Sequence, residues 1–117
     1  MKHEFALDLK VERRKAGLSQ GDVAHLLDVH PSKVSLLEAG RLMPSLRDIC
    51  SLTVLYGKSF ESLFYGVLKK TAGNLKGRFQ KMPDAPKRWL PSFNRKASLS
   101  GLAERLEAIT PDDHETT

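Results

Sequence analysis

The sequence predicts an all-α protein, and three observations support that prediction. Across residues 5–64, apolar side chains recur three or four positions apart, which is the spacing of one helix face. Glycines and short polar residues divide this stretch at intervals, as helix caps do. No part of it alternates apolar and polar residues for long enough to make a convincing strand. We therefore expect five short helices within residues 1–68, which we call the head.

Cap residues place the first two helices. The first should run over residues 5–16 and end at Gly17, because glycine adopts the left-handed turn at a helix end without strain. The second should open with Ser19 as N-cap, because Asp22 three positions later completes the pattern of a capping box. The side chains that these two helices are expected to turn inward are Phe5, Leu9, Ala16, Val23, Ala24 and Leu27.

The next three helices are marked in the same way. Pro31 fits the first position of the third helix, where its missing N–H is not needed, and Gly40 closes that helix. Ser45 and Asp48 form a second capping pattern at the start of the fourth helix, and Ser59 caps the fifth. The side chains expected to face inward here are Val34, Leu37, Leu46, Ile49, Leu52, Leu55, Phe60, Leu63 and Phe64.

The segment from Leu18 to Gly40 contains two helices of about two turns, joined by a turn of about three to four residues. A small residue in the first of them, Ala24, would let the second cross close by at a steep angle, as in a helix-turn-helix. The pattern resembles the phage-repressor-like family of helix-turn-helix regulators, also called Cro/cI-type or XRE, over roughly residues 5–65. The matching residues are Arg13, Gly17, Leu18, Ser19, Gln20, Ala24, Val29, Val34, Ser35, Glu38, Gly40, Pro44 and Ser45.

The resemblance implies a surface that binds double-stranded DNA. In this family the second helix of the motif lies in the major groove, and its N-terminal half touches base edges. Gln20 matches a position that anchors a phosphate, and Arg41 matches a basic position that contacts the DNA backbone. Leu36 offers apolar contact, for instance with a thymine methyl group, whereas Lys33 could reach a guanine edge or a phosphate. The residues expected on the reading surface are His30, Ser32, Lys33, Ser35 and Leu36.

The resemblance also implies an ion pair between Arg13 and Glu38, which we favour over a contact of Arg13 with DNA. Two positions depart from the family. Asp28 stands in the turn where glycine is usual, and aspartate tolerates a left-handed backbone better than most residues. Pro31 stands where the family frequently has a polar or basic side chain that contacts bases. The proline reduces the hydrogen-bonding surface that faces the major groove.

The net charge of +5 is unevenly distributed along the chain. Residues 1–68 carry a net charge of +1, residues 69–96 carry +8, and residues 97–117 carry −4. We interpret residues 69–96 as a basic arm or linker, in which three prolines prevent one long helix. Three roles are open for it: an extended arm on DNA phosphates, a solubilising linker, or a surface that stacks Trp89 and Phe93 on single-stranded nucleic acid.

Residues 97–117 are expected to form a short amphipathic helix followed by an acidic tail. This helix either provides a dimer contact or docks onto the head of the same chain. After Pro111 the tail is expected to be disordered. The apolar residues of the helix, three and four positions apart like the seam of a coiled coil, are Leu99, Leu102, Leu106 and Ile109.

The remaining sequence features argue against other classes of protein. No serine, histidine and acidic residue stand in a recognisable catalytic arrangement, so we expect no enzyme. No cysteine and histidine cluster has the spacing of a metal site, and no cofactor is expected. The single cysteine, Cys50, is interpreted as an inert, half-buried thiol in a reducing cytoplasm. No apolar run approaches the length of a membrane span, and Glu4 and Asp8 interrupt the N-terminus too early for a signal peptide.

These inferences lead to one main hypothesis and two alternatives. The main hypothesis is a sequence-specific transcriptional regulator of bacterial or phage origin, a repressor that acts as a homodimer on an inverted-repeat operator. The first alternative is an antitoxin or antirepressor whose residues 69–117 bind a partner protein. The second is an RNA-binding module built on residues 69–96.

Overall fold

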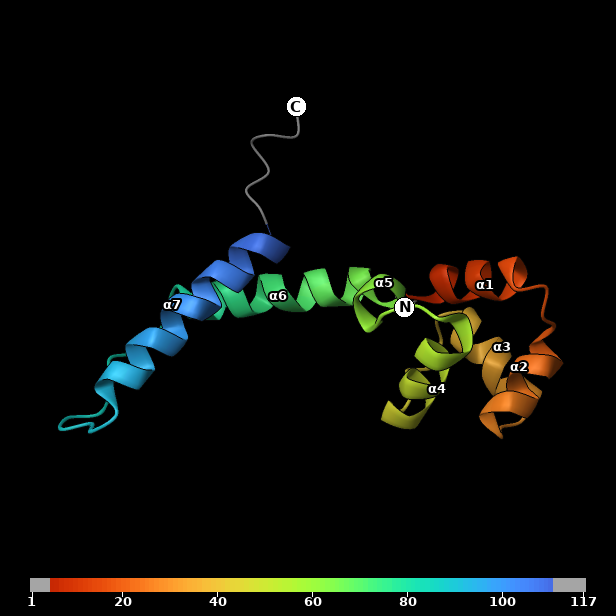
Figure 1. The fold of residues 1–117 in the computed structure, drawn as a ribbon, viewed down its shortest axis with the longest axis horizontal. Helices are drawn as coiled ribbons and strands as arrows, with labels where there is room; N and C mark the ends of the chain where they lie inside the picture. Colours follow the sequence, from red (N-terminus) through yellow and green to blue (C-terminus); the bar gives the residue numbers. More distant parts are fainter. Residues whose placement is uncertain (1–4, 111–117) are drawn as a thin grey trace, which may run out of the picture. The chain divides into compact units, whose positions relative to one another are not determined.

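The computed structural model describes residues 5–110 of the chain (Figure 1). This part of the chain contains helices and loops and no strand, so the all-α prediction is confirmed for it. The chain divides into two compact units, Met1–Leu68 and Lys69–Thr117, and each is described by itself. The acidic tail predicted after Pro111 lies outside the described residues. The helices are α1 (Ala6–Lys15), α2 (Gln20–Leu27), α3 (Pro31–Glu38), α4 (Leu46–Tyr56), α5 (Phe60–Leu63), α6 (Tyr65–Phe79) and α7 (Ser92–Ile109).

Both predicted capping boxes are present. The Ser19 hydroxyl accepts the Asp22 N–H at 3.0 Å, and the Asp22 carboxylate accepts the Ser19 N–H at 2.9 Å. Ser45 and Asp48 make the same reciprocal pair at the start of α4, at 3.1 and 3.0 Å. Each box satisfies two backbone donors that a helix start would otherwise leave unpaired, so these four residues fix where α2 and α4 begin.

The turn between α2 and α3 contains the expected left-handed residue. Asp28 has a φ of 56° and forms the C-cap of α2. Its N–H donates to the carbonyl of His25 at 3.2 Å, and the Val29 N–H donates to the carbonyl of Ala24 at 3.0 Å. Aspartate therefore occupies the position that glycine usually holds, and the turn keeps its hydrogen bonds.

The core of the head lies where the first five helices meet. Phe5 and Phe64 stand near opposite ends of this unit's sequence and contact each other in the core, with ring centroids 5.6 Å apart in an edge-to-face arrangement. Such a pair adds about 0.5–1.5 kcal/mol beyond the area that it buries. The buried residues of this core are Phe5, Leu9, Val23, Ala24, Leu27, Val34, Leu37, Leu52, Leu63 and Phe64.

Three residues expected inside are exposed instead. Ala16 lies beyond the last turn of α1, and Phe60 is 42% exposed. Leu46 is 77% exposed, because the first turn of α4 turns its polar Asp48 inward rather than its leucine. Leu46 instead shares the outer side of the helix with Val54, two turns further on.

The C-terminal unit contains more helix than the sequence predicts. Residues 69–79 lie in α6, and α7 begins at Ser92, ahead of the helix expected within residues 97–117. Both ends of residues 69–96 are therefore helical rather than extended, and the choice between an arm and a linker stays open. Only residues 80–91 lie outside helices, and this is where the three prolines stand.

Within this unit, α7 runs back beside α6 (Figure 1). The Lys76 ammonium lies 3.3 Å from the Glu107 carboxylate and donates to the carbonyl of Thr110 at 3.3 Å. Leu106 on α7 and Ala72 on α6 are each 3% exposed. The other members of the predicted seam are half-buried: Leu99, Leu102 and Ile109.

Candidate nucleic-acid interface

Helices α2 and α3 pack as the two helices of a helix-turn-helix. Ala24 is buried between them, together with Val34 and Leu37 from α3. The small Ala24 side chain allows the two backbones to approach closely, as the motif requires. Pro31 stands at the first position of α3, where the sequence placed it.

The outward side of α3 carries the residues that sequence reasoning assigned to base contact. Ser32, Ser35 and Leu36 are exposed, and their spacing of three and four positions puts them on one side of the helix. The opposite side holds the buried Val34 and Leu37. The exposed side therefore offers two hydroxyl groups and one branched apolar side chain to a binding partner.

His30 has a structural role that sequence reasoning missed. It is the N-cap of α3, and its Nδ1 accepts the backbone N–H of Ser32 at 3.1 Å. The Ser32 hydroxyl also lies 2.9 Å from this nitrogen. Because serine, threonine, aspartate and asparagine are the usual caps, nothing in the sequence marked histidine for this position. The cap ties the His30 ring to Ser32 at the start of the predicted reading surface.

Lys33 is held within the head in this structure. Its ammonium lies 2.8 Å from the Asp48 carboxylate on α4. The Asp48 side chain is 5% exposed and that of Lys33 is 33% exposed. Burial raises the pKa of Asp48, but the Lys33 and Ser45 hydrogen bonds outweigh it and hold the pKa below the usual 3.8. A contact between Lys33 and DNA would have to share or break this ion pair.

The ion pair that the resemblance implied, Arg13 with Glu38, is present. Arg13 Nε lies 2.7 Å from Glu38 Oε2, and Arg13 Nη1 donates to the carbonyl of Leu18 at 3.0 Å. The predicted phosphate anchor, Gln20, donates its side-chain amide to Glu38 Oε1 at 3.2 Å. An amide group has two donor hydrogens, so this bond leaves one of them for a phosphate oxygen. The three side chains link α1, α2 and α3.

Arg41 lies just beyond the end of α3. Its backbone N–H donates to the carbonyl of Leu36 at 3.0 Å, and the preceding Gly40 has a φ of 74°, which gives the left-handed turn at the helix end. The Arg41 side chain is exposed and makes no ion pair with the described residues. It is therefore placed at the surface, as a contact with the DNA backbone would require.

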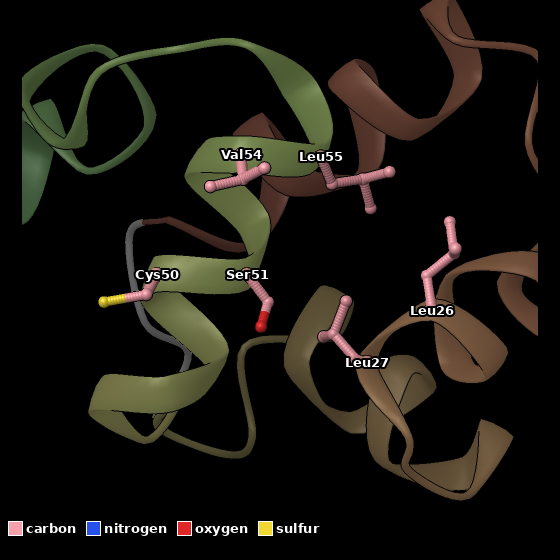
Figure 2. Close-up of a pocket in the computed structure, with 6 residues that line it drawn as sticks. All are labelled: Leu26, Leu27, Cys50, Ser51, Val54 and Leu55. Atoms are coloured by element: carbon pink, nitrogen blue, oxygen red, sulfur yellow. The ribbon is translucent and has the colours of Figure 1, made fainter.

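An apolar hollow of about 510 Å³ lies between α2 and α4 (Figure 2). Its walls are side chains from these two helices: Leu26, Leu27, Cys50, Ser51, Val54 and Leu55. Cys50 is exposed, so the expectation of a half-buried thiol is wrong.

Within residues 5–110, no group of three or more histidine, cysteine and acidic residues is placed to hold a metal ion. None of the described helices combines the length and apolar character that crossing a membrane demands.

Comparisons with known proteins agree with this geometry. Residues 4–60 match a family model described as a helix-turn-helix domain. A solved structure described as a transcriptional regulator from Listeria innocua is similar, with a TM-score of 0.51 and 20% sequence identity. The match covers 96% of this chain and 100% of that one, and at this identity it bears on the fold alone. No curated protein matches the sequence. Residues 4–60 of this chain are therefore a helix-turn-helix domain.

Proposed function

We propose that this protein is a sequence-specific transcriptional regulator that binds double-stranded DNA through α3. One observation carries the proposal: α3 belongs to a helix-turn-helix domain and exposes Ser32, Ser35 and Leu36 on one side, while its other side is buried. A helix held in this way fits the major groove with its N-terminal half against base edges.

Each exposed group has a distinct role in this proposal. The Ser32 and Ser35 hydroxyls donate to or accept from either base type, and Leu36 contacts a thymine methyl group. Gln20 at the start of α2 and Arg41 beyond α3 bind phosphates on either side of the groove. Lys33 stays on Asp48 and supports α3, unless the DNA offers a phosphate that can share its ammonium.

The mode of action follows from the family resemblance. The protein acts by binding rather than by catalysis, in the cytoplasm of a bacterium or of a phage-infected cell. It represses transcription as a homodimer on an inverted repeat, with half-sites about one helical turn apart. Sedimentation of the full chain with and without DNA measures the number of copies on each operator.

One observation favours the alternative of an antitoxin or antirepressor. In the C-terminal unit, Leu90 is 94% exposed and Phe93 is 80% exposed, and Met82 and Trp89 nearby are also exposed. Exposed apolar groups at this density are typical of contacts with a protein partner. Purification from the native host distinguishes the two functions, because an antitoxin should emerge with a partner in a fixed ratio.

Selection of bound fragments from the source genome tests the main proposal. The full chain is mixed with sheared genomic DNA, and the retained fragments are sequenced. A regulator should enrich a small set of fragments that share an inverted repeat. A variant with Ser35→Ala and Leu36→Ala should lose that enrichment while its circular dichroism spectrum stays unchanged. Retention of random fragments by both proteins would contradict the proposed sequence specificity.

A further inference from the structure

Two glycines on the outer side of α6 have no role in packing. Gly73 and Gly77 lie one helical turn apart, and a Cβ added to either would meet no side chain or neighbouring segment within 4 Å. Glycine inside a helix is about 0.5–1 kcal/mol less stable than alanine. The described structure therefore has room for alanine at both positions and no packing reason for glycine.

The missing side chains leave a polar hollow on this side of the helix. It measures about 500 Å³ and is lined by Gly73, Asn74, Gly77, Arg78, Gln80 and Lys81. These lining residues supply two side-chain amides and two cations, and none of them carries a carboxylate. Amides, guanidinium and ammonium groups all donate N–H bonds, so the hollow has the chemistry of an anion site.

The cations around the hollow are not neutralised. Arg78 and Lys81 are exposed and make no ion pair with any residue in the range 5–110, and the same holds for Lys70, which precedes the hollow on the outer side of α6. Lys76, by contrast, binds Glu107 on α7. The helix thus uses Lys76 for packing and presents Lys70 and Arg78 on the side of the two glycines.

We propose that this hollow binds backbone phosphates of duplex DNA, as a second DNA contact outside the helix-turn-helix. The inference rests on the proposed function, because it assigns another contact with the same ligand. Phosphate oxygens accept hydrogen bonds in any sequence, which suits a surface of cations and amides without carboxylates. The absence of side chains at Gly73 and Gly77 lets a sugar–phosphate backbone approach the helix closely.

The glycines give a test in which stability and binding change in opposite directions. In the full chain, Gly73→Ala with Gly77→Ala should leave thermal stability equal or higher, because alanine favours the helix. The same variant should bind a genome-selected duplex about tenfold more weakly, which corresponds to the removal of one charge-assisted hydrogen bond. The matched control is Gly101→Ala on α7, a helical glycine outside the hollow, which should bind as the parent does.

The cations give a second test that does not depend on helix propensity. Lys70→Gln, Arg78→Gln and Lys81→Gln together should lower the slope of log affinity against log salt by about 0.9 for each phosphate that the variant no longer binds. The control variant removes the same charge elsewhere in the unit, at Lys87, Lys96 and Arg105, which are exposed and outside the hollow. Its slope should stay close to that of the parent chain.

The outcomes separate the inference from the proposed function. Equal slopes for the two triple variants, or no change in either, would overturn the inference and leave DNA binding by α3 in place. Full binding by the double alanine variant would overturn it as well. A parent chain that binds no duplex would refute the proposed function, and the inference with it.

Discussion

Arg13 and Glu38 join α1 to the end of α3 through a contact of 2.7 Å between Arg13 Nε and Glu38 Oε2. Their side chains are 12% and 5% exposed, so the pair is shielded from water. Hydrogen bonds from Gln20 to the same carboxylate and from Arg13 to the carbonyl of Leu18 complete the arrangement. The pair fixes the orientation of α3 on the rest of the head, and thus the direction in which Ser32 and Ser35 point.

Removal of Arg13 should destabilise the head. Arg13→Ala leaves Glu38 buried without its cation, and breaking a buried pair in this way lowers the free energy of unfolding by about 3 kcal/mol. Arg13→Lys should recover part of that loss, because it keeps the charge but not the guanidinium geometry. Urea denaturation of the full chain measures both. A loss below about 0.5 kcal/mol for Arg13→Ala would show that the pair contributes no more than an ordinary surface contact.

The Tyr56 hydroxyl should lose its proton at a higher pH than the hydroxyl of an exposed tyrosine. Burial raises its pKa to about 12, and the negative charge of Glu38 acts in the same direction. Because tyrosine in the unfolded chain ionises near 10, this contribution to stability is present below pH 10 and is lost as the pH rises towards 12. Ultraviolet titration should show a late tyrosinate phase that Tyr56→Phe removes. A parent chain that keeps its helical circular dichroism while both of its tyrosines ionise together would contradict the assignment.

Asp48 should make stability depend on pH in the acid range. Its folded pKa lies below the usual 3.8, so its contribution is present above that value and is lost as the pH falls through the folded pKa. Asp48→Asn removes the ion pair with Lys33 and should lower the free energy of unfolding near neutral pH by about 1–2 kcal/mol, less than for a fully buried pair. Denaturation from about pH 6 to pH 3 should show a shallower decline for this variant than for the parent chain. An identical decline in both would exclude Asp48 as the source.

Two neighbouring leucines on α3 should behave in opposite ways. Leu37 is 2% exposed, so Leu37→Ala should lower the free energy of unfolding by about 2–5 kcal/mol. Leu36 is 43% exposed, so Leu36→Ala should change it by no more than about 0.5 kcal/mol and should instead weaken DNA binding. Thermal unfolding and a binding titration of each variant measure the two effects. Reversed roles would mean that the opposite side of α3 faces the DNA.

Local signals in the sequence were sufficient for most of the head. The serine and aspartate pairs predicted where α2 and α4 begin, because a capping box is formed by residues three positions apart. The left-handed Asp28 followed from the family pattern together with the tolerance of aspartate for that conformation. The Arg13–Glu38 pair came from the resemblance and not from spacing.

Contacts between distant residues could not be predicted in the same way. Lys33 and Asp48 stand in different helices, and only the tertiary structure of the head brings them together. The sequence marks Asp48 as a cap residue, and its second role as a buried partner depends on the tertiary structure. The assignment of base or phosphate contact to Lys33 stays a prediction, which has to account for this ion pair.

The C-terminal unit was harder to predict, because its composition masked its helices. The cations and prolines of residues 69–96 indicated an arm or linker without a long helix, yet the prolines stand only in the loop between α6 and α7. Two glycines inside α6 weakened the helix signal further. Burial of Ala72 on α6 and Leu106 on α7 compensates for that low propensity.

The most direct test of DNA sequence recognition by α3 measures the affinity for two duplexes, for the parent chain and for one variant. The affinity of the full chain for a genome-selected duplex is divided by its affinity for a scrambled duplex of the same length, at one salt concentration. For the parent chain the ratio should reach about 10³ or more, and Ser35→Ala with Leu36→Ala should reduce it at least about tenfold without a change in melting temperature. A ratio near one for the parent chain, or the same ratio for both proteins, would contradict base recognition by this helix.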